Sequence, residues 1–469
     1  MTTRPGLRRA LALSVLTALS RASVAAAQPK QEAQPEITAQ PQVTAQPEAT
    51  AQPTVAPSIP EQSVSLADLD SQLGTEPLAA AEPARGLSVY GFADAGWHKY
   101  FLRPGSLLRA NLYEDNTFLV GNLNVYLSGE LGGGWRSLVE VRFTYLPNGS
   151  RVVGAGGVQR TSTDAADYTN VSLPRQTGSI LIERAWIEYA ASAALSLRLG
   201  SWLTPYGIWN EDHGSPTIIP VTRPYVIGLE FLPERQTGLL LSGSAYLSDS
   251  LTLGYSLGLS NGRGPIQEYA DLDENKAVTA RLQLNHHGAG DLHLGAAAYL
   301  GRYTNLDQVV QASGDTYVID EPIREQYDEL SWALDARYLI GGLHLQSEFV
   351  LSQRKFTERG RPMRTGSFEF QPDDRRLGGY VLGGYRFDWL GIMPYATAEF
   401  TSLLNYWETF RSPTRDVMTV YALGINSRPT TNVTLKLEGN LGLFHSEHAR
   451  GSGFEHPARA IQAQVAWAF

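Results

Sequence analysis

The sequence predicts an all-β protein, a transmembrane antiparallel β-barrel of about 16 strands behind a disordered N-terminal extension. Three observations predict this fold. From residue 86 onward, apolar and polar residues alternate in one segment after another, with the period of a β-strand. One face of these segments is apolar and the other is polar or small, as lipid outside and water inside a barrel require. The connections alternate between short and long, which is typical of the two rims of an outer-membrane barrel.

Residues 1 to 27 have the pattern of a signal peptide. Arg4, Arg8 and Arg9 precede the apolar run ALALSVLTALS, and the alanines at 25 to 27 supply a cleavage site before Gln28. This pattern predicts export from the cytoplasm. The alternative is a frayed, apolar N-terminal helix.

Residues 28 to 85 form a low-complexity region rich in alanine, glutamine and proline. The tripeptide A-Q-P recurs every six residues between residues 27 and 53. Such a composition cannot bury a core, so we expect an extended periplasmic linker, with one short helix near residues 65 to 73. The linker is either a passive tether or a spacer that contacts the cell wall.

The transmembrane barrel is predicted over residues 86 to 469. One clear strand covers residues 117 to 131, where Leu123, Val125 and Leu127 alternate with Asn124 and Tyr126. The 16 predicted strands are residues 87 to 97, 117 to 131, 135 to 146, 178 to 190, 195 to 203, 235 to 247, 251 to 260, 276 to 287, 291 to 301, 328 to 340, 342 to 355, 377 to 389, 393 to 406, 417 to 427, 431 to 445 and 458 to 469.

The last predicted strand and the aromatic residues indicate the bacterial outer membrane. Val465, Trp467 and Phe469 alternate with small residues, so the chain finishes on an aromatic carboxyl terminus, as bacterial outer-membrane barrels do. Tyrosines and tryptophans, for example Trp97 and Trp202, stand near segment ends, as in the girdles at a membrane interface. The alternative is a secreted β-sandwich whose apolar faces pack on each other.

Composition excludes several classes of function. The chain has no cysteine, which removes disulfides and thiolate chemistry, and its formal net charge of -9 argues against a nucleic-acid partner. The G-x-S-x-G match at residues 254 to 258 lies inside an alternating segment rather than on a nucleophile elbow. His445, Glu447, His448 and His456 cluster in the last long loop but lack a fixed scaffold for a metal. We expect no enzyme activity, no metal and no cofactor.

The connection between residues 204 and 234 is the third long loop and the expected pore constriction. Five prolines prevent it from continuing a sheet, and a structureless loop of this length is usually functional. The charged residues that we expect to set the field and width of the pore are Glu211, Asp212, His213, Arg223, Glu230, Glu234 and Arg235.

A second set of charged residues is expected on the lumen wall, because it stands on the polar faces of the predicted strands. Opposed rings of charge select ions in water-filled pores. The alternative is that these charges only pair across the strands. The predicted pore-lining residues are Arg136, Glu140, Arg142, Arg198, Glu348, Arg354, Arg386, Lys436 and Glu438.

Two motifs resemble a known family. RAWIEY at residues 184 to 189, followed by LSLRLGSWLTPYG at 195 to 207, is similar to bacterial porins of the phosphate-selective O and P type. The resemblance implies a 16-stranded barrel, a homotrimer, and a third loop that narrows a passive channel. Anion-selective members have lysine-rich linings, whereas this chain has few lysines and an acidic loop, so the charge preference stays open.

The sequence therefore predicts an outer-membrane porin with a water-filled channel for small hydrophilic solutes or ions, including anions such as phosphate. Its expected partners are outer-membrane lipid, the solutes and two further copies of the chain. One alternative is a structural or adhesive barrel with a plugged lumen. Another is an outer-membrane hydrolase, which requires a convergent serine or histidine site at a rim.

Overall fold

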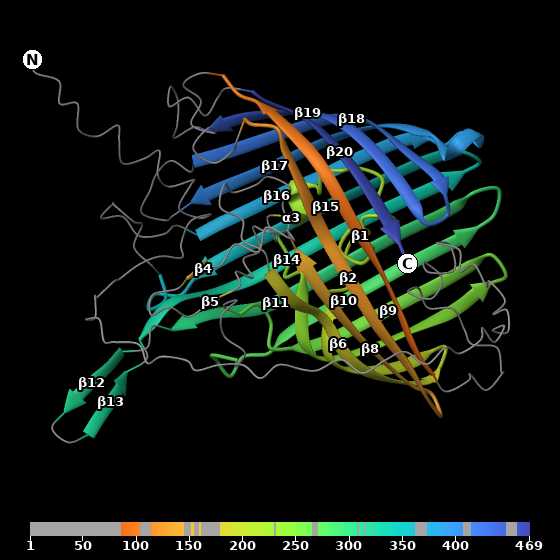
Figure 1. Cartoon of the computed structure of the whole chain (residues 1–469). Helices are drawn as coiled ribbons and strands as arrows, with labels where there is room; N and C mark the ends of the chain where they lie inside the picture. The colour runs from red at the N-terminus through yellow and green to blue at the C-terminus, as the bar shows by residue number, and fades with distance from the viewer. Residues whose placement is uncertain are drawn as a thin grey trace, which may run out of the picture.

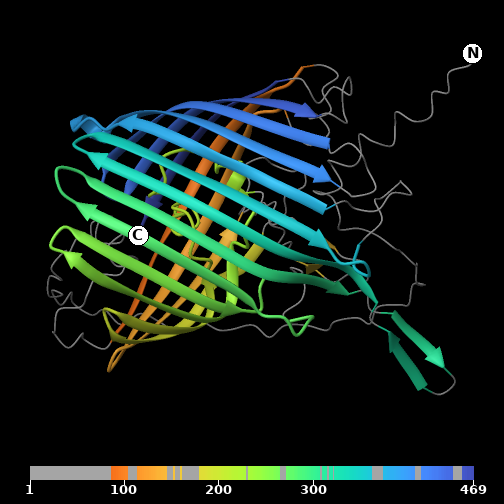
Figure 2. The same cartoon turned by 180° about the vertical axis from the view of Figure 1, so that it is seen from behind.

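The chain forms a closed antiparallel β-barrel (Figures 1 and 2). The computed structural model describes residues 86–103, 114–144, 152–153, 159–160, 179–228, 231–264, 271–306, 309–313, 316–320, 322–361, 373–406, 414–446 and 457–469. The predicted signal peptide and the linker of residues 28 to 85 lie outside these ranges. The 16 barrel strands confirm the predicted fold class and follow one another around the wall in chain order.

The observed strands begin and end close to the predicted positions. The barrel consists of β1 (Gly86–Phe101), β2 (Thr117–Gly132), β3 (Trp135–Thr144), β6 (Ser179–Ser192), β7 (Leu195–Leu203), β8 (Arg235–Ser248), β9 (Leu251–Ser260), β10 (Ala277–His287), β11 (Asp291–Leu306), β14 (Ile323–Ile340), β15 (Leu343–Phe356), β16 (Asp373–Tyr385), β17 (Met393–Tyr406), β18 (Thr414–Thr430), β19 (Val433–Ser446) and β20 (Ala458–Ala468). Two small hairpins, β4 (Val152–Val153) with β5 (Gln159–Arg160) and β12 (Val309–Ser313) with β13 (Thr316–Asp320), stand apart from the barrel sheet.

The connections differ in length at the two ends of the barrel. Between the barrel strands, one end has short turns such as residues 133 to 134, where Gly133 and Gly134 adopt positive φ angles that favour glycine. The opposite end has the long connections, and the β12–β13 hairpin projects beyond it (Figures 1 and 2). The loop of residues 204 to 234 is the third long connection, as predicted.

The barrel closes where its first and last strands meet. β1 pairs with β20 from Phe92 opposite Ala468 to Phe101 opposite Arg459. The C-terminal Phe469 extends this pairing, because its N–H and carbonyl both bond to Gly91 at 2.9 Å. A Cβ on Gly91 would lie 2.8 Å from the Phe469 ring, so glycine makes room for the aromatic terminus.

The outer face of the barrel is apolar. Leu87, Phe118 and Leu423 are among its most exposed side chains, at 70%, 80% and 71% exposure. So much exposed apolar area would be unstable in water, whereas lipid accepts it. A closed barrel with this exterior is the architecture of a protein of the bacterial outer membrane. The described part of the chain contains no helix with the length and hydropathy of a membrane span.

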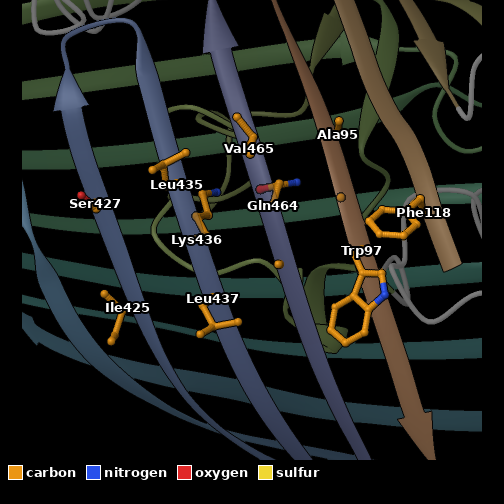
Figure 3. Close-up of a pocket in the computed structure, with 12 residues that line it drawn as sticks. Ala95, Trp97, Phe118, Ile425, Ser427, Leu435, Lys436, Leu437, Gln464 and Val465 are labelled. Atoms are coloured by element: carbon orange, nitrogen blue, oxygen red, sulfur yellow. The ribbon is translucent and has the colours of Figure 1, made fainter. Parts of the chain in front are cut away.

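A shallow groove marks this outer face near the closure of the barrel (Figure 3). The small residues Ala95, Gly96 and Ala463 line it together with larger side chains such as Trp97 and Leu437. The groove is therefore a feature of the lipid-facing surface and does not belong to the lumen.

Candidate pore constriction

The loop of residues 204 to 234 leaves and re-enters the barrel wall at one place. Thr204 N–H donates to the Glu234 carbonyl at 2.9 Å, which brings the two ends together. The Asn210 side-chain amide bonds to the carbonyls of both Thr204 (2.8 Å) and Glu234 (3.1 Å). The loop thus has a closed neck, and its body is free to fold as a unit.

The body of the loop lies inside the barrel. Residues between 209 and 231 bond to inward-facing side chains of β10, β14, β15, β17, β18, β19 and β20. The helix α3 (Tyr225–Gly228) lies within the barrel and packs against β16 and β17 (Figures 1 and 2). The direction of folding is therefore into the lumen.

Apolar packing holds this body against one side of the wall. Burial of each large apolar side chain contributes about 1.5–3 kcal/mol, so a docked loop is strongly favoured over a mobile one. The buried loop side chains are Tyr206, Trp209, Ile219, Val226, Ile227, Phe231 and Leu232, and they pack with Ala277, Ala297, Tyr299, Ala333, Val350, Tyr380, Leu382, Met393 and Tyr395 of the strands.

On the β15 to β19 side, the predicted lining residues Glu348 and Glu438 do face inward, but the loop covers them. Glu348 accepts a hydrogen bond from Trp209 N–H at 2.8 Å, and Glu438 accepts from Val221 N–H at 2.9 Å. Lys436, also a predicted lining residue, is buried and donates to the Pro220 carbonyl at 3.1 Å. These three charged groups contact the loop rather than open water.

The opposite side of the wall, on β3, β6, β7 and the start of β8, carries paired charges. Glu188 accepts from Arg136 Nε at 2.6 Å and from Arg198 Nε at 2.7 Å. Five arginines and three glutamates form this charged side, the arginine wall. They are Arg136, Arg142, Arg184, Arg198 and Arg235, with Glu140, Glu183 and Glu188.

The arginine wall is wetter at its guanidinium groups than at its carboxylates. The Arg136, Arg198 and Arg235 side chains are 33%, 23% and 28% exposed, whereas the three glutamates have no exposed side-chain area. Arg198 lies opposite Leu240 of β8, five residues along the strand from Arg235, so the exposed arginines extend along about 16 Å at roughly 3.3 Å per residue. Positive groups therefore face the water of the lumen over much of its length.

His213 of the loop points toward the arginine wall. Its Nε2 lies 4.0 Å from Glu140 Oε1 and 4.0 Å from Glu183 Oε1, and its Nδ1 lies 3.3 Å from the Asn210 carbonyl. Burial lowers the pKa of His213 below its usual value of 6.5, and the two carboxylates oppose this shift. The imidazole is therefore uncharged at neutral pH.

Two of the three described acidic residues of the loop, Glu211 and Glu234, have arginine partners. Glu234 pairs with Arg223 at 3.0 Å and with Arg235 at 3.6 Å. Glu211, whose side chain is 38% exposed, lies 3.6 Å from Arg281 Nε. Asp212 accepts a hydrogen bond from Thr217 at 2.5 Å. Glu230 lies outside the described residues. The acidic composition of the loop therefore overstates its negative field.

The two remaining predicted lining residues lie away from the loop anchors and the arginine wall. Arg354 on β15 shares Glu329 with Arg263 and stacks on the Tyr327 ring, with 4.8 Å between its guanidinium carbon and the ring centroid. Arg386 follows the last residue of β16 and donates to the Gly391 carbonyl at 2.7 Å. Arg386 therefore belongs to a short turn at the rim, not to the strand face on which the alternation predicted it.

Several inward charges were not predicted from the sequence. Glu188 and Glu399 follow the same alternation as the predicted residues, with Ile187 and Phe400 as their outward neighbours, so the signal was present. Glu183 and Arg184 are adjacent in sequence, and both face inward because the pairing of β3 with β6 shifts between Glu140 and Val141. A period of two cannot reveal such a shift.

The described residues contain no group of three or more histidine, aspartate or glutamate side chains placed to hold a metal ion. His445 lies near the end of β19, and Glu447, His448 and His456 lie outside the described residues. The G-x-S-x-G match at residues 254 to 258 lies within β9, in a strand rather than at a turn.

No protein-family model matches the sequence, and no curated protein matches it significantly. Among solved structures, it is similar to OmpT, an outer membrane protein of Vibrio cholerae (12% identity, TM-score 0.47, 84% of this chain and 100% of that chain). It is also similar to the anion-selective porin from Comamonas acidovorans (12%, 0.46, 82% and 100%) and to the outer membrane channel DcaP of Acinetobacter baumannii (11%, 0.47, 84% and 100%). At these identities the similarity concerns the fold alone, and the O and P type stays a prediction.

Proposed function

We propose that this protein is a porin, an outer-membrane channel through which small hydrophilic solutes or ions diffuse passively. The observation that carries the proposal is the arrangement of the lumen, in which a folded loop crosses the barrel and leaves the guanidinium groups of the opposite wall in contact with water. Such a pore needs no cofactor and no covalent chemistry, because position and charge alone decide which solutes pass.

The same wall supports a preference for anions. Five arginines stand against three glutamates, and each of Glu183 and Glu188 is shared by two arginines. A surplus of positive groups along a confined aqueous path raises the local concentration of anions and lowers that of cations. Inorganic anions such as phosphate and small organic carboxylates are the solutes that this field favours.

The proposal extends to the surroundings of the barrel. Outer-membrane lipid covers its apolar exterior, and three copies assemble as a homotrimer. Residues 1 to 27 direct export as a signal peptide, and residues 28 to 85 serve as a periplasmic linker that can contact the cell wall.

The loop core favours one other candidate. Trp209, Ile227 and Leu232 are buried in the lumen at 3%, 0% and 0% exposure, so the loop fills part of the barrel as a plug would. A barrel plugged in this way would serve a structural or adhesive purpose without passing solutes.

Recording in a planar lipid bilayer distinguishes these functions. We expect the purified full chain to insert in discrete conductance steps with an ohmic current. Under a salt gradient the reversal potential should show a permeability for chloride above that for potassium. A folded barrel that inserts without current would contradict the channel, and a reversal potential of the opposite sign would contradict the anion preference.

A further inference from the structure

Three glutamates of the barrel wall bind the backbone of the loop at separate points. Glu348 accepts from Trp209 N–H at 2.8 Å, and Glu399 accepts from Val226 N–H at 2.8 Å. Glu438 accepts from Val221 N–H at 2.9 Å through Oε2 and from Thr222 N–H at 3.1 Å through Oε1. These three glutamates form the glutamate clamp. They stand on β15, β17 and β19, at intervals of two strands.

Among the described residues, no cationic group lies within 4.0 Å of a clamp carboxylate. In the part of the chain that the structure describes, every ion pair within 4.0 Å involves other acids, such as Glu188 and Glu329. All three clamp side chains are buried, at 3%, 7% and 1% exposure for Glu348, Glu399 and Glu438. A buried carboxylate requires hydrogen-bond donors, and here the loop backbone supplies them.

The surroundings of the clamp are built for these contacts. Tyr380 donates to Glu348 at 2.6 Å, and Tyr395 donates to Glu438 at 2.7 Å, so a second ring of side chains fixes two of the carboxylates. At Gly207, where φ is +63°, a Cβ would lie 1.9 Å from Glu348 Oε2. Glycine at this position therefore lets the loop reach the carboxylate.

We propose that Glu348, Glu399 and Glu438 are positioning residues that hold the constriction loop at a fixed depth and thereby set the width of the pore, a role that rests on the proposed channel function. The neck at Thr204 and Glu234 joins the loop to the wall on one side only. The clamp binds the far side, so the loop can neither swing out of the lumen nor slide along it.

The hydrogen bonds predict which substitutions release the loop. Glu438 uses both oxygens, because Tyr395 and Val221 donate to Oε2 while Thr222 and Asn440 donate to Oε1. Glutamine at position 438 would turn an NH2 group toward two donors, so Glu438→Gln should loosen the loop. Glu399 accepts from Val226 N–H through Oε1 and also from the backbone N–H of Tyr225. Glu399→Ala removes this acceptor, so it should loosen the loop as well.

Hydrogen exchange of the loop amides tests the clamp without requiring a current. We expect Glu438→Gln and the triple Glu→Ala variant to exchange about tenfold or more faster than wild type in peptides that cover residues 205 to 228. Glu130→Gln on β2 is the matched control, since Glu130 has no hydrogen bond to the loop among the described residues. Unchanged exchange in folded Glu438→Gln and in the triple variant would overturn the clamp.

Single-channel recording supplies the second readout. The variants in which the loop is released, Glu438→Gln and the triple Glu→Ala variant, should show larger and noisier conductance than wild type. Thr222 Oγ1 and Asn440 Nδ2 are 3.1 Å apart. A disulfide between Thr222→Cys and Asn440→Cys should restore the wild-type current to Glu438→Gln when it is oxidised, and reduction should abolish the rescue. The wild-type chain has no cysteine that could interfere. A silent wild type with conducting released variants would support the clamp and contradict the open channel. Conducting variants with unchanged currents would contradict the clamp alone.

Discussion

The two sides of the lumen use the same residue type in opposite ways. On the arginine wall, each glutamate is neutralised by guanidinium groups, and the surplus positive charge faces water. In the glutamate clamp, each carboxylate is satisfied by backbone N–H groups, and the loop itself covers it. The comparison shows that an inward position does not make a glutamate a pore charge, because the charge that faces water is that of the exposed arginines around it.

Removal of the loop body should have the largest effect on this comparison. We expect a short Gly-Ser link between Thr204 and Glu234, which are joined by a 2.9 Å hydrogen bond, to raise the single-channel conductance several-fold. The clamp glutamates would then face water and oppose the arginines, so anion selectivity should fall. Conductance and reversal potential measure both effects. A conductance equal to wild type would show that the loop does not limit the current.

Trp209→Ala should loosen the loop by removing its largest buried apolar side chain. Truncation of a buried tryptophan costs about 3–5 kcal/mol, and here the cost falls on docking of the loop rather than on the barrel strands. We expect faster proteolysis of the loop and noisier current, while the barrel keeps its resistance to unfolding in SDS. Trp389→Ala is the matched control, because Trp389 is 73% exposed. Equal proteolysis of both variants would contradict the packing role.

Neutralisation of the arginine wall should change selectivity more than conductance. Arg136→Gln with Arg198→Gln removes two guanidinium groups that are 33% and 23% exposed and leaves Glu188 unpaired. We expect the reversal potential to move toward cation preference, because the sign of the local charge reverses. Glu438→Gln, on the other side, should alter current noise with a smaller shift in reversal potential. The same shift in both variants would erase the distinction between the two sides.

Acidification should have the smallest effect, through His213. Because its pKa lies below 6.5, His213 is neutral at pH 7 and gains its proton as the pH falls through the lowered value. The new charge lies 4.0 Å from Glu140 and Glu183, so it adds to the positive field and increases anion preference at low pH. His213→Asn should lack this component of the pH profile. Identical profiles for wild type and variant at every pH below 6.5 at which the barrel stays folded would contradict it.

The sequence by itself determined the strands and their two faces. The period of two is local, so the exposure of Leu87 to lipid and the inward position of Arg136 or Glu438 follow from a few neighbouring residues. The alternation of short and long connections can also be seen in the sequence. This alternation identified the loop of residues 204 to 234 as the third long connection. Local periodicity failed where the pairing shifts, at Glu183 and Arg184, and where the strand had already ended, at Arg386.

Only the tertiary structure decided where the loop goes and which charges remain in water. The bonds that hold the loop join residues far apart in the chain, such as Trp209 with Glu348 and Val221 with Glu438, and such pairs leave no period in the sequence. The sequence placed Glu140 and Glu438 in one class, as lining charges. Closure of the barrel around the loop separated them, because one carboxylate met an arginine and the other met a backbone amide.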